Sequence, residues 1–302
     1  METQIFNIDS RFRDTTLYPN STNYVYSIPN EIKNIVEVKL SSLEYGNTSY
    51  VFTSEKGNNT FTIDDGSPTG LIFTLTPGNY TPEELVAEIN AWLALHCSNI
   101  TLILDTNTGK VTFTSSTDEF TLEFPSIDDY KSLGEMLGFT GTDYTSSGFS
   151  LTAENIINVM GEHYYFLKLN ELGKVYNKNQ KYFCKFIVDA PKFEVTYESR
   201  NIFVTKAVTL EQPINTQKLK IQVYDVNNNI VDHNGFEFSF TLEMKVVRND
   251  TLKKYKEMTF DTLELKKLVL YDKMLQYYDN KMKDSKDRRS LGTIYHKLIQ
   301  KL

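Results

Sequence analysis

Short apolar runs alternate with polar turn clusters along most of the chain, which is the pattern of antiparallel strands. The runs are rich in Val, Ile, Thr, Tyr and Phe, and Asn, Asp and Gly separate them. The turn clusters at 105–109 and 225–229 predict hairpins, and the second leads into a polar loop. The predicted strands cover 23–28, 35–45, 60–63, 71–75, 101–104, 111–114, 164–169, 181–188, 193–197, 202–210, 218–224 and 236–247.

Two stretches in the first half carry helix start signals. Thr81 is a capping residue, Pro82 takes the first helical position, and Glu84 stands three residues after the cap. The helix should lie against a sheet, because its apolar residues share one stripe with His96: Leu85, Ile89, Trp92 and Leu93. A cap signal at Ser126 to Asp129 predicts a short helix that Gly138 ends and that contains Leu133, Met136 and Leu137.

The last section of the chain changes to helical periodicity and basic charge. Residues 249–302 hold 13 basic and 8 acidic residues, net +5, whereas the other 248 residues hold 19 and 31, net −12. An acidic body argues against a dedicated duplex-DNA binder, whereas a basic tail suits an acidic surface on a neighbour, a nucleic acid or a membrane. Two helical stripes flank the basic segment 281–289: Leu265, Leu268, Leu275 and Met282, then Leu291, Ile294, Tyr295, Leu298 and Leu302.

These patterns predict a mainly β fold. Residues 1–49 should form an N-terminal arm and the first strands of a β-sandwich, 50–152 an α/β insertion, 153–248 the remaining strands, and 249–302 a basic helical C-terminal extension. Outside the insertion eight strands remain, which is the number in a jelly roll. The predicted class is a jelly-roll-like antiparallel β-sandwich. A two-domain β arrangement predicts a similar string of strands, so the topology stays open.

Enzyme chemistry finds little support in the sequence. The four histidines, His96, His163, His233 and His296, are scattered and lack metal-ligand spacing, and Cys97 and Cys184 fit small core positions. Residues 225–236 resemble a calcium loop at first, but Ile230 and Phe236 stand where glycine and glutamate are needed. We therefore expect no catalytic residue, no cofactor and no metal site. No stretch approaches the ~20 apolar residues of a spanning helix, and without a secretory signal pattern we expect the protein on the cytosolic side.

Several short motifs resemble minor capsid proteins in virions of the nucleocytoplasmic large DNA viruses. The resemblance covers roughly residues 5–247 in patches and leaves out the basic tail. It rests on Ile8-Asp9-Ser10-Arg11-Phe12-Arg13-Asp14, Tyr18-Pro19-Asn20 with NYVYSIP, IKNIVEVKLSSLEYGN, Gly78-Asn79-Tyr80-Thr81 with Leu85 and Asn90, Leu137-Gly138-Phe139, and Asp232-x-x-Gly235-x-Glu237-x-Ser239-Phe240.

The resemblance implies a non-enzymatic virion structural protein that binds and stabilises neighbouring capsid proteins. It implies a location in the capsid after assembly in the host cytoplasm. The expected partners are the major capsid protein, other minor capsid proteins and further copies of the chain, without specific nucleic acid. The basic tail would also permit contact with an inner membrane.

The candidate partner-binding residues lie at both ends of the chain. Residues 5–29 would act as an arm in which Arg11, Arg13 and Tyr18 meet a partner. The alternative is that the arm packs on its own sheet, with Asp9 and Asp14 pairing the arginines. In the tail, apolar residues would dock in a neighbour's groove or on the chain's own body, beside exposed basic residues: Leu291, Ile294 and Leu298, with Lys281, Lys283, Arg288 and Arg289.

Two other classes of function stay open on sequence alone. An attachment or carbohydrate-binding β-sandwich would need exposed aromatic rings in a loop cluster, for which Tyr144 and Tyr176 are candidates without close aromatic companions in sequence. A nucleoprotein-like factor would use the basic tail on a genome, and its binding would weaken steeply with salt.

Overall fold

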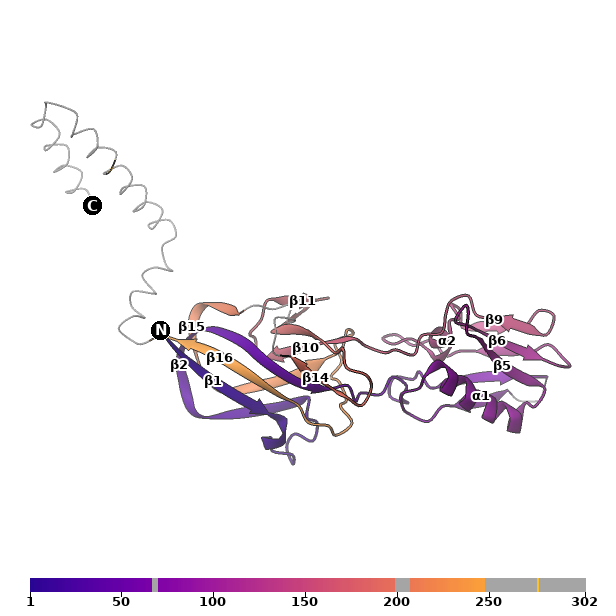
Figure 1. Ribbon diagram of the computed structural model, residues 1–302, viewed down its shortest axis with the longest axis horizontal. Helices are drawn as coiled ribbons and strands as arrows, with labels where there is room; N and C mark the ends of the chain where they lie inside the picture. The colour runs from indigo at the N-terminus through magenta and orange to yellow at the C-terminus, as the bar shows by residue number, and fades with distance from the viewer. Residues whose placement is uncertain (67–69, 199–206, 248–275, 277–302) are drawn as a thin grey trace, which may run out of the picture.

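The computed structural model describes residues 1–66, 70–198, 207–247 and Gln276, and the predicted C-terminal helices and their candidate residues lie outside this part. The strands of the described residues pair antiparallel, which confirms the mainly β class with an α/β insertion (Figure 1). The helices are η1 (Ser10–Phe12), α1 (Pro82–His96) and α2 (Leu133–Leu137). The strands are β1 (Glu2–Asp9), β2 (Asn23–Gly46), β3 (Thr60–Asp64), β4 (Leu71–Thr74), β5 (Ile100–Asp105), β6 (Lys110–Ser115), β7 (Thr121–Glu123), β8 (Asp143–Thr145), β9 (Ser150–Thr152), β10 (Tyr164–Leu169), β11 (Val175–Asn177), β12 (Gln180–Tyr182), β13 (Cys184–Ile187), β14 (Val195–Glu198), β15 (Val208–Tyr224) and β16 (Ser239–Val246).

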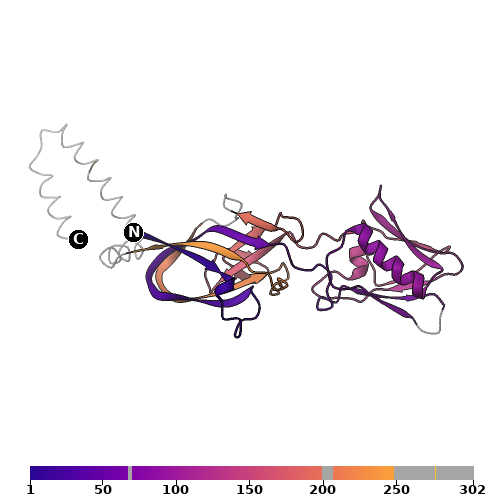
Figure 2. The ribbon, with the colours of Figure 1, turned by 60° about the horizontal axis from the view of Figure 1, so that its bottom comes forward.

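The largest sheet has seven strands in the order β1-β16-β2-β15-β10-β13, with β14 also paired to β2. Its long strands β2 and β15 curl, so that the sheet folds over onto itself around a core (Figures 1 and 2). The bend coincides with three register shifts between β2 and β15, from Thr209 to Lys218. Pro29 and Pro213 lie in this stretch. Because proline donates no N–H to a ladder, it marks places where pairing is interrupted and a strand can bend.

The core of this curled sheet is dominated by aromatic and branched side chains. Tyr45 lies at its centre, stacked on His233 with ring centroids 4.3 Å apart and in edge contact with Phe186 at 4.9 Å. The cluster draws from β1, β2, β10, β13, β15 and β16, and includes Ile8, Tyr24, Leu167, Leu219 and Phe240. Each fully buried side chain of this size contributes about 1.5–3 kcal/mol of hydrophobic stabilisation, so this cluster fixes the register of the long strands.

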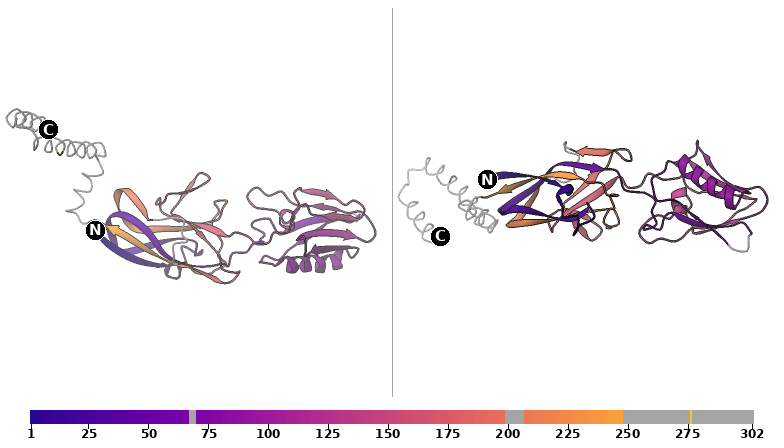
Figure 3. Two further views of the ribbon diagram at one scale, coloured as in Figure 1. Left: turned by 45° about the horizontal axis from the view of Figure 1, so that its top comes forward. Right: turned by 90° about the horizontal axis from the view of Figure 1, so that it is seen from below.

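Residues 51–157 form a second hydrophobic cluster with its own sheets. One sheet has the order β4-β3-β7-β8 and the other β5-β6-β9, and α1 lies along them (Figure 3). The predicted capping box of α1 is confirmed, because Thr81 accepts from the Glu84 N–H at 3.1 Å and Glu84 accepts from the Thr81 N–H at 2.9 Å. Asn90 anchors the helix to β5 through two 2.8 Å bonds with the Leu102 backbone.

The predicted start of the second helix was wrong. Ser132, not Ser126, caps α2, and Glu135 completes a capping box with it. Ser126 lies three residues after the end of β7, outside any helix or strand, so the polar run 126–129 is a connection. The predicted end is confirmed, because Gly138 takes a left-handed φ of 101°. A Cβ there would stand 2.3 Å from the Asn155 carbonyl oxygen, so glycine is required.

Several strand predictions change in extent. The predicted strands at 23–28 and 35–45 form one continuous strand, β2, because the backbone stays extended through Pro29. The run 218–224 likewise belongs to β15, which begins at Val208. In the neighbouring predicted strand, 202–210, residues 202–206 lie outside the described part of the chain. β16 begins at Ser239 instead of 236, because residues 233–236 form a turn in which Phe236 donates to the His233 carbonyl. β1 was not predicted as a strand.

Candidate functional site

The predicted arm residue Arg13 is built into the fold. Its side chain is 5% exposed and bonds through Nη1 to Glu237 at 2.5 Å. The same guanidinium donates to the carbonyls of Ser10 at 2.8 Å, Tyr18 at 2.8 Å and Pro19 at 2.9 Å. Each acceptor of these bonds is a backbone carbonyl or a carboxylate of the same chain. Arg13 therefore closes the loop 10–22 around its own side chain.

Glu237 receives a second bond from the same loop. Ser10 Oγ donates to it at 2.5 Å, and the Ser10 hydroxyl also accepts from the Phe238 N–H at 2.9 Å. Burial alone would raise the pKa of Glu237, but the bonds from Arg13 and Ser10 outweigh it and lower that pKa. Glu237 is thus held ionised opposite Arg13. The sequence analysis missed this pair, although both residues stand in motifs that carry the family resemblance.

Arg11 and Asp14 behave differently from each other. Arg11 is exposed and pairs with Asp9 at 2.5 Å, as the self-packing alternative predicted. The side-chain bond from Arg11 lowers the pKa of Asp9. Asp14 instead accepts from the N–H groups of Thr16 and Leu17 and shapes a turn. Arg13 therefore takes Glu237 as its carboxylate partner, and Asp14 serves the backbone.

Tyr18 contacts the loop and the core. Its side chain is half-buried and packs against the first hydrophobic cluster, while its backbone carbonyl accepts from Arg13. Among the three predicted residues of the arm, Arg11 has the most exposed side chain. The roles of Arg11, Arg13 and Tyr18 in binding a partner stay predictions. The seven candidate residues of the tail, from Lys281 to Leu298, lie outside the described residues.

The remaining polar side chains of the loop tie it to the segment 231–238. Ser21 donates to the Phe236 carbonyl at 2.6 Å, and Thr22 donates to the Val231 carbonyl. Ser10 N–H donates to the Phe238 carbonyl at 3.0 Å. The two motif segments 8–20 and 232–240 are more than 200 residues apart in sequence and meet here. Phe12 and Leu17 project from this fixed loop and are 78% and 69% exposed.

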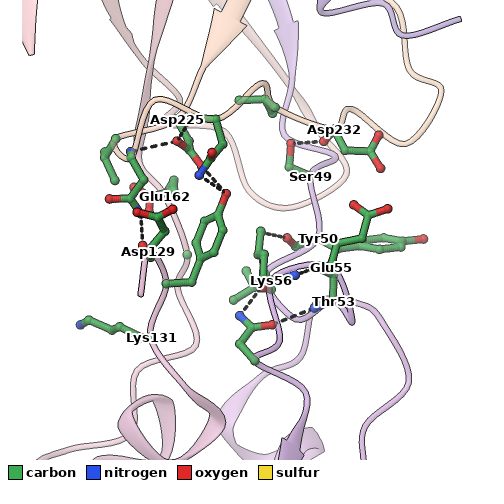
Figure 4. Close-up of a pocket in the computed structure, with 18 of the residues that line it drawn as sticks. Ser49, Tyr50, Thr53, Glu55, Lys56, Asp129, Lys131, Glu162, Asp225 and Asp232 are labelled. Atoms are coloured by element: carbon green, nitrogen blue, oxygen red, sulfur yellow. Dashed lines mark hydrogen bonds between the residues drawn. The ribbon is translucent and has the colours of Figure 1, made fainter. Parts of the chain in front are cut away.

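A second site is an open cleft of about 1020 Å³ where the insertion meets the curled sheet (Figure 4). Tyr130, from the insertion, donates to Asp225 at 2.7 Å and accepts from Asn229 at 2.8 Å, both in the loop after β15. Asn227 in the same loop donates to the Asp129 carbonyl. Burial and the bond to Asp225 raise the pKa of Tyr130, so it remains a donor. These bonds join the two hydrophobic clusters.

Charged groups line the same cleft. Lys56 Nζ donates to the Tyr50 carbonyl at 2.5 Å and lies 5.7 Å from the centre of the Tyr130 ring. Burial lowers the pKa of Lys56 and raises the pKa of Glu162. Lys192 bonds Asn47 at 3.3 Å. Both lysines thus bond to residues 47–50, one of the segments that connect the two clusters. Sequence patterns missed these lysines because Lys56 and Lys192 are far apart in the sequence.

The buried histidine of the first cluster has a structural environment. His233 Nε2 donates to the Gly46 carbonyl at 2.7 Å, and its ring stacks on Tyr45. Burial lowers the pKa of His233, which keeps the ring neutral and apolar enough for this position. Across the described residues, no group of three His, Cys, Asp or Glu side chains is arranged to hold a metal ion.

The two aromatic candidates for carbohydrate binding do not form one platform. Tyr144 does have aromatic companions, with Phe139 at 5.0 Å and Phe124 at 6.2 Å, but these belong to the buried second cluster. Its hydroxyl accepts from the N–H groups of Thr140 and Gly141. Tyr176 is exposed on β11, outside that cluster.

Comparison with known proteins gives matches in structure only. No protein-family model and no curated protein matches the sequence. Two of the solved structures that resemble this chain come from viruses. The penton protein of mavirus has 9% identity and a TM-score of 0.45, and the match covers 82% of this chain and all of that one. A chain of the Sputnik virophage has 10% identity and a TM-score of 0.40, covering 82% of this chain and 98% of that one.

These neighbours contribute no site residue, because identity near 10% carries no correspondence of individual side chains. No helix among the described residues is long and apolar enough to cross a membrane.

Proposed function

We propose that this protein is a non-enzymatic virion structural protein, a minor capsid protein that binds and stabilises neighbouring capsid proteins through its β-sandwich and terminal arms. The observation that carries the proposal is the ion pair between Arg13 and Glu237, which joins two of the motifs that carry the family resemblance. Residues that recur in the family resemblance here fix the shape of a surface loop. A fixed loop is what a protein needs to present contacts to a partner without a large ordering cost.

The loop offers apolar anchors. Phe12 and Leu17 stand on the segment that Arg13 clamps, and their exposure leaves most of their surface available for burial against another protein. Arg11 adds a charged group at the same surface. In this proposal Arg13 and Tyr18 position the loop, whereas Arg11, Phe12 and Leu17 contact the capsid partner.

The rest of the chain would extend the contact. We treat the curled sheet and residues 50–152 as two domains, of which the first carries the loop. The basic residues of the tail, with Leu291, Ile294 and Leu298, would dock on a partner or lie near an inner membrane. The partners would be the major capsid protein and other minor capsid proteins, in virions assembled in the host cytoplasm.

The test is incorporation into virus particles. Replacing both anchors, Phe12→Asp with Leu17→Asp, should lower the copies of the protein per purified particle by about 30-fold or more, because hot-spot anchors contribute roughly 1–2 kcal/mol each. Ile72→Asp is the control, since Ile72 is a similarly exposed apolar residue far from the loop. Quantitative mass spectrometry of particles measures the ratio.

Crosslinking mass spectrometry on the same particles identifies the partner. Links from Lys281, Lys283 or Lys286 to another virion protein would support the role of the tail. Purified particles that contain none of this chain would overturn the proposal. Equal incorporation of the double variant and wild type would overturn the role of the loop.

A further inference from the structure

The N-terminal strand leaves one side of the largest sheet open. β1 is the end strand, and it pairs with β16 over eight consecutive residues without a register shift. β1 and β16 can be followed side by side in Figure 1. Among the strands at the ends of the described sheets, β1 is the longest. No other described strand pairs with its outer side.

Edge strands that avoid pairing with another chain usually carry lysine, proline or a bulge, or are very short. The stretch 3–8 of β1 reads TQIFNI and contains none of these. Ile5, at its centre, is 68% exposed. The edge therefore has the length, regular pairing and apolar character that favour addition of another strand.

The backbone of β1 is in phase for such an addition. Ser10 N–H, one residue after β1, donates to the carbonyl of Phe238, one residue before β16. In an antiparallel ladder alternate residues bond to the same neighbour, so the even-numbered residues of β1 face β16. The backbone groups of Thr3, Ile5 and Asn7 then point to the open edge.

The geometry points to a second copy of the same strand as the partner, paired antiparallel about a twofold axis at Ile5. This register places Ile5 opposite Ile5, and Thr3 opposite Asn7, so apolar meets apolar and polar meets polar on the outer face. On the inner face Gln4 lies opposite Phe6. No charged residue stands among these pairs.

The charges nearest this edge on the outer face are already compensated within one copy. Lys245 pairs with Glu37 at 2.6 Å, and Lys39 pairs with Glu243 at 3.7 Å. Glu243 is the neighbour of Ile5 on β16, and Lys245 is the neighbour of Thr3. A second copy therefore meets paired charges on this face, which removes a common penalty against self-association.

The inner face has room for the added side chains. A groove of about 390 Å³ runs between β1 and the bend of β2, lined by Gln4, Phe6, Ile28, Pro29 and Ile32 among others. In the proposed register the second copy's inner-face side chains approach this groove. Pockets for alternate side chains beside an edge strand are the usual source of selectivity in strand addition. The contact is smaller than the ~800 Å² per partner of a standard interface, so pairing should depend on protein concentration.

Disulfide formation between full-length cysteine variants reads the register directly. Cα atoms of directly opposite residues are about 5.5 Å apart in a bonded pair, which suits a disulfide. Under mild oxidation, Ile5→Cys should form disulfide-linked dimers at least about ten-fold faster than a variant whose exposed cysteine meets its copy only by random collision. Thr3→Cys alone should not, since its two copies would be about 14 Å apart, but Thr3→Cys mixed with Asn7→Cys should.

The controls separate pairing from collision and misfolding. Ile72→Cys, at 66% exposure on β4, gives the background of an equally exposed cysteine. The native Cys97 and Cys184 are buried, and burial raises the pKa of Cys97 to about 11, so both react slowly. Ile5→Lys should abolish concentration-dependent dimers in light scattering and keep the melting temperature of wild type, because Ile5 is exposed.

Two outcomes would overturn the inference. Ile5→Cys that crosslinks no faster than Ile72→Cys would exclude self-pairing, and Thr3→Cys that crosslinks as fast as Ile5→Cys would exclude this register. The experiment uses purified protein, whereas the proposed virion role is tested on particles. Either result can fail while the other stands.

Discussion

Arg13 shows how one side chain can organise a surface loop. Its guanidinium bonds Glu237 and the carbonyls of three residues of the same loop, and its side chain is almost fully covered. A planar group with five donors can satisfy several acceptors at once, which lysine cannot do in the same geometry. The loop shape therefore depends on Glu237 keeping its charge.

Replacing Glu237 should expose this dependence. Glu237→Gln leaves the covered Arg13 charge without its carboxylate, and we expect the free energy of unfolding to fall by about 2 kcal/mol. This is less than the 3–5 kcal/mol of a fully buried pair, since Glu237 is partly exposed. The measurement is urea unfolding at pH 7. Glu31→Gln is the control, because its pair with Lys33 is exposed and should cost under about 0.5 kcal/mol.

The dependence on pH has a fixed sign. The pKa of Glu237 is lowered in the folded protein, so the unfolded state binds the proton more readily. The stability that this carboxylate contributes is present above pH 4.5 and is lost as the pH falls through the folded pKa. Glu237→Gln should therefore lose less stability than wild type on acidification below pH 4.5. Identical acid dependence of the two proteins would contradict the role given to this pair.

At the scale of elements, capping signals and hairpin turns predict well where the local sequence alone decides. The box at Thr81 and Glu84 and the terminator Gly138 were both found from sequence, because each acts within one turn of the backbone. The start of α2 was misplaced although a local signal for it exists. Ser132 with Glu135 forms the complete capping-box pattern, whereas Ser126 is followed three residues later by Asp129.

A pair of serine variants tests this assignment. Ser132→Ala removes the side-chain oxygen that accepts from the Glu135 N–H and should cost about 1 kcal/mol of stability. Ser126→Ala is the matched control and should change stability by less than about 0.5 kcal/mol, as surface substitutions do. Thermal unfolding of both variants gives the comparison. An equal loss in both would mean that the helix does not depend on Ser132.

Long-range features escaped prediction for a physical reason. β1 becomes a strand only because it pairs with β16, which lies more than 200 residues later in the sequence. The six central residues of β1 carry no turn signal at either side that would mark them as a strand. The bond between Arg13 and Glu237 and the cleft around Tyr130 likewise join distant segments. A pattern of apolar and polar positions records which face of a segment is buried, and it does not record which segment covers that face.

The described part of the molecule contains two hydrophobic clusters joined by a small polar contact. Tyr130, Asp225 and Asn229 provide side-chain bonds across the junction. Each cluster buries its own apolar side chains. Loss of the junction bonds should therefore change how the clusters are held together more than it changes the stability of either one.

Tyr130→Phe tests this separation of roles, because it keeps the ring over Lys56 and removes only the hydroxyl that Asp225 and Asn229 share. Asp225 would keep its bonds from the Asn227 and Asn229 N–H groups, so the loop should retain its local turn. We expect the melting temperature to change little and hydrogen exchange in residues 225–231 to accelerate several-fold. Tyr176→Phe, at an exposed position on β11, should leave exchange unchanged. A large drop in melting temperature with unchanged hydrogen exchange would instead show that the junction belongs to one cooperative core. Local opening accelerates exchange only where a segment can open separately from global unfolding.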